Sequence, residues 1–138
     1  MGPLSRTAAT LRFFSDDLNP AELTRRLGQQ PTVGVAKGGT WVTELGAEKV
    51  SLRGAWRLEA PERNDGNLDA QIRGLLDPLS SDLANWEDLT NRFQADIFLG
   101  LFLENGNEGV TLQPNTLAAM GLRNLALNFD IYGPEEGD

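Results

Sequence analysis

The stretch "LQPNTLAAMGL" at residues 112–122 carries the same Leu-x-Pro-x-x-Leu pattern as "LNPAELTRRLG" at residues 18–28. In each copy the proline suits the first position of a helix, because its φ angle is fixed near the helical value and its missing N–H has no helical partner to lose. A glycine closes each short helix. Strand patterns precede both copies, and another follows the second directly. We interpret the repeat as two strand-helix-strand halves, not as a paired ligand site.

Two apolar segments define the first half of the chain. "TAATLRFFS" at residues 7–15 ends at a turn, which predicts a strand, and Asn19 is a good N-cap for the helix that follows. "AWRLEA" at residues 55–60 alternates in polarity, as expected for a half-buried strand. Trp56 and Leu58 are therefore expected to face inward.

The middle of the chain is less regular. The glycine-rich segment at residues 29–54 has no sustained period, so we predict a mobile connection with a strand or hairpin embedded in it. Apolar residues at helical spacing follow at residues 68–79 and 82–93, with a break at Pro78. These two segments predict the longest helical region.

The last third predicts strand, helix and strand. "QADIFLGLFLE" at residues 94–104 is almost continuously apolar, which indicates a strand covered on both faces or central in its sheet. The helix of residues 112–122 is expected to bury Leu117 and Met120. Residues 124–133 alternate in polarity and predict a final strand with one buried face. The residues expected on that buried face are Leu125, Leu127, Phe129 and Ile131.

The predicted fold is therefore α+β, with two strand-helix-strand halves. We expect a ferredoxin-like two-layer sandwich in which helices pack on a mostly antiparallel sheet. At 138 residues the chain has the length of one domain. We assign that domain to residues 7–133 and expect disordered ends at residues 1–6, which resemble a tag, and at the acidic residues 134–138.

Composition limits the function. The formal charge is −8, which disfavours nucleic acid and anionic membranes as partners. The chain has neither cysteine nor histidine, so it lacks thiolate chemistry and the commonest general base and metal ligand. We expect no cofactor and no metal. A poor leader pattern and the lack of a long apolar stretch predict a cytoplasmic protein.

Two residues of the first half are candidates for ligand binding. Lys37 lies in the glycine-flanked "AKGG", where its ammonium and the neighbouring N–H groups could meet an anion. The simpler alternative is a solvated loop lysine, because the phosphate-loop pattern is absent. Trp56 could stack on a planar ligand, whereas its place on an alternating strand favours the core.

Asp130 and Tyr132 share the outward face of the last predicted strand and could form a polar pocket wall. The alternative is that Asp130 pairs with Arg57 or Arg123 on the surface. Acidic residues also cluster in asparagine- and glycine-rich turns, but none of these clusters matches a calcium-loop pattern, and turn chemistry explains them.

Several segments in order resemble the bacterial domain-of-unknown-function family 4279 over about residues 8–133. They are "LNPAELTRRLGQQPT", "KGG", "WRLEA", "LLDPL" and "TLQPNTLAAMGLRNLALNFDIYG". Their order and spacing carry the resemblance, not any single motif. Ala60 departs from it, since the family usually has a serine there. The resemblance implies no activity, because that family has none assigned.

Two function classes are left. We favour a noncatalytic protein-binding module, regulatory or immunity-like, whose acidic surface meets a basic protein partner. The alternative is a small-molecule-binding protein, or a small enzyme, with Asp, Lys and Tyr in a pocket near Lys37 and Asp130. We assign no catalytic residue. A homodimer is compatible with both classes, because the apolar run at residues 97–103 suits either a core strand or an interface strand.

Overall fold

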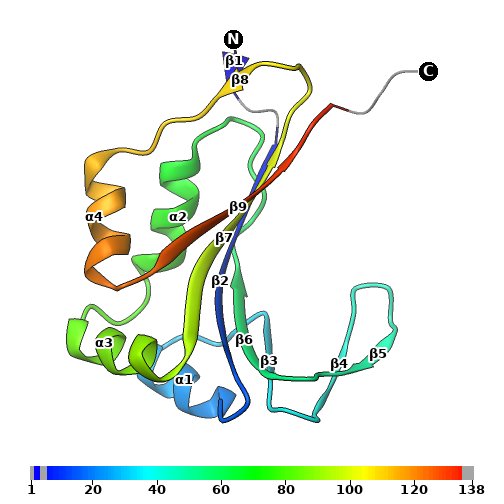
Figure 1. The fold of residues 1–138 in the computed structure, drawn as a ribbon, viewed down its shortest axis with the longest axis vertical. Helices are drawn as coiled ribbons and strands as arrows, with labels where there is room; N and C mark the ends of the chain where they lie inside the picture. The colour runs from blue at the N-terminus through cyan, green and yellow to red at the C-terminus, as the bar shows by residue number, and fades with distance from the viewer. Residues whose placement is uncertain (1, 4–5, 135–138) are drawn as a thin grey trace.

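A computed structural model describes residues 2–3 and 6–134, and its centre is a five-stranded mixed sheet (Figure 1). The strands lie in the order β3 (Val33–Val35), β6 (Gly54–Glu59), β2 (Arg6–Ser15), β7 (Gln94–Phe102) and β9 (Ala126–Tyr132). All neighbours are antiparallel except β7 and β9, which are parallel. The prediction of a mostly antiparallel sheet is confirmed.

The helices lie on one face of this sheet, as predicted (Figure 1). They are α1 (Pro20–Leu27), α2 (Leu68–Leu76), α3 (Leu83–Arg92) and α4 (Pro114–Leu122). Asn19 caps α1 by accepting the N–H of Ala21, and Gly28 ends the helix in the left-handed region at φ 81°. These caps confirm the signals of the first Leu-x-Pro copy.

The embedded hairpin predicted within residues 29–54 is present and stands on the opposite side of the sheet. It consists of β4 (Thr40–Val42) and β5 (Glu48–Val50), and we call residues 40–50 the arm. Outside the main sheet, β1 (Gly2–Pro3) pairs in parallel with β8 (Glu108–Gly109). The disorder expected at residues 1–6 and 134–138 falls largely outside the described residues.

The core fills the space between the sheet and the helices. Trp56 and Trp86 are fully buried, with ring centroids 6.0 Å and 6.2 Å from that of Phe13. Leu11 on β2 and Ile97 on β7 are register partners and are equally buried. The inward position predicted for Trp56 is confirmed. Among the described residues, no helix is both long and apolar enough to cross a membrane.

The strand order does not confirm the ferredoxin-like arrangement. That arrangement splits each strand-helix-strand unit around another strand, whereas β7 and β9 are direct neighbours and β2 and β6 are antiparallel. The first crossover also includes the arm and β3, so the two halves are not equivalent. The Leu-x-Pro repeat therefore marks two similar helix starts within unequal halves.

The burial predicted near the C-terminus is wrong in part. Leu117 is 47% exposed, and the buried residues of α4 are Thr116, Ala119 and Met120. Phe129 and Ile131 occupy the helix-side face of β9 as predicted, but they are 48% and 60% exposed. β9 is the edge of the sheet, so the helix layer does not cover these side chains.

Candidate functional site

The helix-free face of the sheet, which we call the open face, carries arginines stacked on aromatic rings. The guanidinium carbon of Arg6 lies 3.8 Å from the ring centroid of Phe102, and that of Arg12 lies 4.3 Å from the centroid of Phe98. Tyr132 extends the row, because its ring stacks on Phe102 at 4.7 Å. Such contacts help to hold each cation at a defined position.

Arg12 also has a counter-ion. Its Nε and Nη2 donate to the two carboxylate oxygens of Asp96 at 2.8 Å and 2.7 Å, and Asn128 donates to the same carboxylate. The Asp96 side chain is almost completely buried, whereas Arg12 is partly exposed. This paired arrangement ties β2, β7 and β9 together on the open face.

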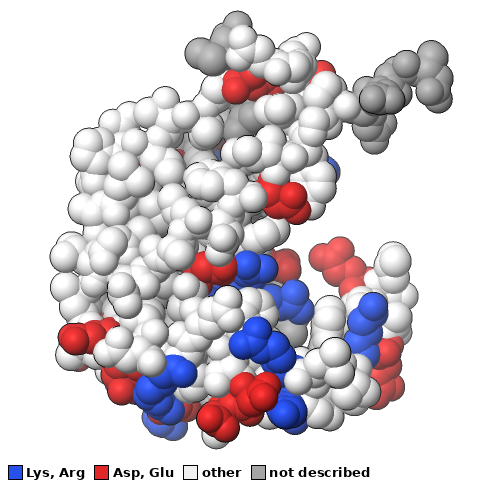
Figure 2. All heavy atoms as spheres, in the orientation of Figure 1, with Lys and Arg blue, Asp and Glu red and all other residues white. Residues whose placement is uncertain are grey.

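The arm encloses a hollow of about 700 Å³ over the β3 end of the open face. Figure 2 shows this hollow as the indentation between the body and the arm, with basic side chains at its base. Trp41 of the arm lies over Arg57 of β6, with 5.0 Å between the guanidinium carbon and the ring centroid. Arg57 forms no ion pair with a described residue, in contrast to Arg12.

The structure brings the predicted pair Asp130 and Tyr132 together. The Tyr132 hydroxyl donates a hydrogen bond to the Asp130 carboxylate. This hydrogen bond, with burial and the carboxylate charge, raises the pKa of the Tyr132 phenol above its usual value. The alternative ion pairs of Asp130 are not formed. Arg57 lies over Trp41, and Arg123 lies over Trp86 and donates to a helix carbonyl.

The other two predicted residues lie elsewhere. Lys37 is exposed at the base of the arm and pairs with Asp16 at 3.3 Å, and the N–H groups of Gly38 and Gly39 donate to carbonyls of the chain. Trp56 is a core residue whose Nε1 donates to Thr24. Lys37 follows β3 and Asp130 lies on β9, the opposite edge of the sheet, so the predicted shared pocket is not assembled.

A second candidate surface, which we call the α4–β9 surface, has very few charged residues. From Gly109 to Phe129 the sequence has one charged residue, Arg123, and its guanidinium is engaged over Trp86. Burial lowers the pKa of that guanidinium. The exposed apolar side chains of this surface are Val110, Leu117, Leu122, Phe129 and Ile131. In Figure 2 the side of the molecule that bears α4 is almost free of charged residues.

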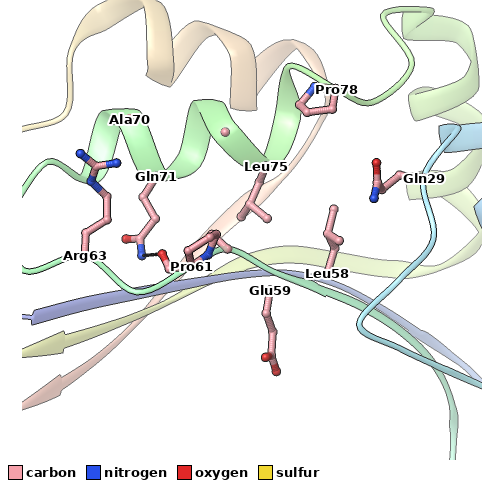
Figure 3. Close-up of a pocket in the computed structure, with 11 residues that line it drawn as sticks. Gln29, Leu58, Glu59, Pro61, Arg63, Ala70, Gln71, Leu75 and Pro78 are labelled. Atoms are coloured by element: carbon pink, nitrogen blue, oxygen red, sulfur yellow. Dashed lines mark hydrogen bonds between the residues drawn. The ribbon is translucent and has the colours of Figure 1, made fainter.

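A pocket of about 260 Å³ lies between α2 and the end of β6 (Figure 3). Gln71 is buried beside it and donates its Nε2 to the carbonyls of Thr7 and Pro61 at 2.9 Å each, while its Oε1 has no partner among the described residues. Glu59 points away from the pocket toward the open face (Figure 3). The walls are mainly apolar and include Leu58, Ala60, Pro61, Ala70, Leu75 and Pro78.

The acidic turns have structural roles. Hydrogen bonds from the Arg63 guanidinium and the Asn67 backbone lower the pKa of Asp65 to about 2. Glu108 accepts the N–H groups of Glu104 and Asn105 and so closes its turn. Within the described parts of the chain, no three acidic side chains gather as metal ligands would.

The chain matches the model of one known family, described as a domain of unknown function (DUF4279), over residues 5–134. The chain belongs to this family. The resemblance seen in the sequence is thereby confirmed. No curated protein and no solved structure matches the chain.

Neither candidate surface was predicted, although each has a signal in the sequence. The uncharged run from Gly109 to Leu122 can be read directly in a chain with 23% charged residues. The arginines of the open face alternate with core residues along their strands, as Arg57 does between Trp56 and Leu58. Their aromatic partners lie on other strands, so a single sequence could not identify them.

Proposed function

We propose that this chain is a noncatalytic protein-binding module and that the α4–β9 surface is its interface. The supporting observation is that the uncharged helix α4 and the helix-side face of the edge strand β9 both leave large apolar side chains exposed. Large exposed apolar patches on soluble proteins mark interaction sites.

The free edge of β9 supplies the backbone component of this interface. In the described sheet β9 pairs with β7 alone, so its other edge presents unpaired N–H and C=O groups. Edge strands are commonly protected by charged residues, proline or a bulge. The strand "ALNFDIY" has no proline, and its one charged residue, Asp130, lies on the open face. We therefore expect a partner strand to add to β9 while apolar side chains of the partner cover Phe129 and Ile131.

Site-specific photocrosslinking in the native host tests this function. A photoreactive phenylalanine analogue replaces Ile131 or Leu122, and the matched control replaces Leu45, which is 97% exposed at the tip of the arm. We expect one discrete cross-linked product from positions 131 and 122 and none from position 45. Ile131→Lys should abolish the product formed at position 122.

The products also distinguish the type of partner. A product of twice the chain mass would identify a second copy as the partner, and a different mass would identify another protein. The proposal is wrong if neither position yields a product, or if position 45 yields the same one.

A second candidate function is the binding of a small apolar molecule, and the pocket beside α2 favours it. Its volume of about 260 Å³ suits a fragment-sized ligand. Gly74 lines the pocket, and a side chain added there would meet no atom within 4 Å. Gly74→Leu should therefore fill the pocket and abolish any rise in melting temperature caused by small molecules, whereas a rise that survives would exclude this site.

A further inference from the structure

The hollow under the arm contains a charge that has no counter-ion within the described chain, that of Arg57. Arg57 lies between Val33 of β3 and Arg12 of β2, its register partners. Like charges directly opposite each other on antiparallel strands are unfavourable. Arg12 is neutralised by the bidentate contact with Asp96, but Arg57 has no comparable acidic partner among the described residues. An anion at Arg57 would remove this imbalance.

The Arg57 guanidinium also has unused hydrogen-bonding capacity. Its Nε is buried and donates to no described acceptor, and a buried donor without a partner is costly. Stacking on Trp41 involves the face of the guanidinium, and its two terminal nitrogens, which a ligand in the hollow can reach, donate to no described residue. The planar edge of a guanidinium matches the two oxygens of a carboxylate.

The walls of the hollow indicate what kind of anion it accepts. Val33, Trp41 and Val42 give it apolar surface. Besides Arg57, its charged lining residues are Lys49, Glu44 and Glu59. These acids, together with the net charge of −8, repel a polyanion such as nucleic acid. A single negative charge next to apolar groups is repelled much less than a polyanion.

We propose that Arg57 and Trp41 bind one carboxylate of a peptide segment whose neighbouring side chains are apolar. The carboxylate accepts from the edge of the Arg57 guanidinium, and the apolar neighbours contact Trp41 and Val33. This site lies on the opposite side of the sheet from α4, so it is independent of the interface proposed above.

Tryptophan fluorescence provides a direct test. Trp56 and Trp86 are fully buried, so the partly exposed Trp41 is the tryptophan expected to respond. The probe is the blocked peptide acetyl-Leu-Glu-Leu-amide, and the matched peptide has glutamine in place of glutamate. We expect saturable quenching by the glutamate peptide in the millimolar range and an affinity at least roughly tenfold lower for the glutamine peptide, since a hydrogen bond to a charged group contributes about 1.5–3 kcal/mol.

Variants test whether the preference for the glutamate peptide depends on Arg57. Arg57→Gln should abolish the preference for glutamate, and Arg57→Lys should weaken it, because lysine keeps the charge but loses the planar edge. Arg25→Gln, on the exposed side of α1, is the matched control and should bind like the unchanged protein. Ile131→Lys should also leave binding unchanged, so failure of the α4–β9 interface would not affect this result.

Three results would overturn the proposal. One is equal quenching by the glutamate and glutamine peptides, and another is a preference for glutamate that persists in folded Arg57→Gln. The third is tighter binding of inorganic phosphate or a single-stranded oligonucleotide than of the glutamate peptide. Circular dichroism confirms folding, and Arg57→Lys provides the test if the glutamine variant does not fold.

Discussion

The α4–β9 surface and the open face meet at β9, but they differ in whether their exposed side chains have partners within the chain. On the α4 side, Phe129 and Ile131 lie half exposed without a cover. On the open face, Tyr132 stacks on a ring and Asp130 accepts its hydroxyl. On the open face, polar side chains are therefore paired within the chain, whereas on the α4–β9 surface apolar side chains are exposed to solvent.

This difference separates stability from binding. Residues whose contacts are already complete within the chain should matter for folding, and residues without contacts should matter only for association. The exception is Arg57, which lies on the organised face but has an incomplete environment. Each surface thus has a distinct expected response to substitution.

The largest expected difference is between two isoleucines on the helix side of neighbouring strands. Ile97 is fully buried on β7, and Ile131 is 60% exposed on β9. Ile97→Ala should cost about 2–5 kcal/mol of unfolding free energy, whereas Ile131→Ala should cost roughly 0.5 kcal/mol or less. Urea denaturation of both variants measures this. A comparable loss for Ile131→Ala would mean that the α4–β9 surface is part of the core.

On the open face, Asp96→Ala should lower the free energy of unfolding by about 1–3 kcal/mol. The substitution leaves Arg12 without its bidentate acceptor and next to the like charge of Arg57. Urea denaturation again gives the value. Arg12→Met combined with Asp96→Leu removes both charges and should recover much of the loss. If the single variant is as stable as the unchanged protein, the arginines of the open face are not structural.

Most of the fold, but little of the site, followed from the sequence. Asn19, Pro20 and Gly28 act locally, so the limits of α1 could be predicted. Alternation placed Trp56 in the core for the same reason. Strand order depends on contacts between distant segments, and therefore the parallel pairing of β7 with β9 could not be predicted from either strand alone.

The candidate site shows the same limit. Asp130 and Tyr132 share a face because they are two residues apart on one strand, which the sequence states directly. Whether Arg57 meets an acid or a ring depends on the path of the arm, which returns to place Trp41 above it. Alternation also could not show that the helix layer stops short of β9, so Phe129 and Ile131 were expected to be buried.

A smaller effect on the free energy of unfolding is expected from substitutions in a third region, where α1 contacts α3. Arg92 donates two hydrogen bonds to Glu22, and these bonds, with the charges of Arg92 and Arg26, lower the pKa of Glu22 below its usual 4.5. The unfolded chain therefore takes up this proton first on acidification. The stabilisation is complete above about pH 4.5 and is lost as the pH falls through the lower folded value.

Glu22→Gln should cost about 0.2–1 kcal/mol at neutral pH, as exposed ion pairs do. Thermal melts across the acidic range should show the difference from the unchanged protein disappearing as the pH falls. Glu87→Gln on α3 is the control, since Glu87 forms no ion pair in the described chain. A difference that persists at acidic pH would assign the effect of Glu22 to packing instead of charge.

The smallest expected effect is spectroscopic, and it tests whether the end of the open face is organised as described. Tyr132 is the one tyrosine of the chain, so the near-ultraviolet absorbance of its phenolate reports its ionisation alone. The midpoint should lie above 10.0, because the ionised phenol would lose its hydrogen bond and face the Asp130 carboxylate. This bond stabilises the fold below that pH and is lost as the pH rises through the higher folded value.

Asp130→Asn should lower the midpoint, with circular dichroism confirming folding at each pH. A midpoint of 10.0 or below in the unchanged protein would mean that Tyr132 and Asp130 are as unpartnered as their neighbours on the α4–β9 surface, and the contrast between the two faces of β9 would be lost.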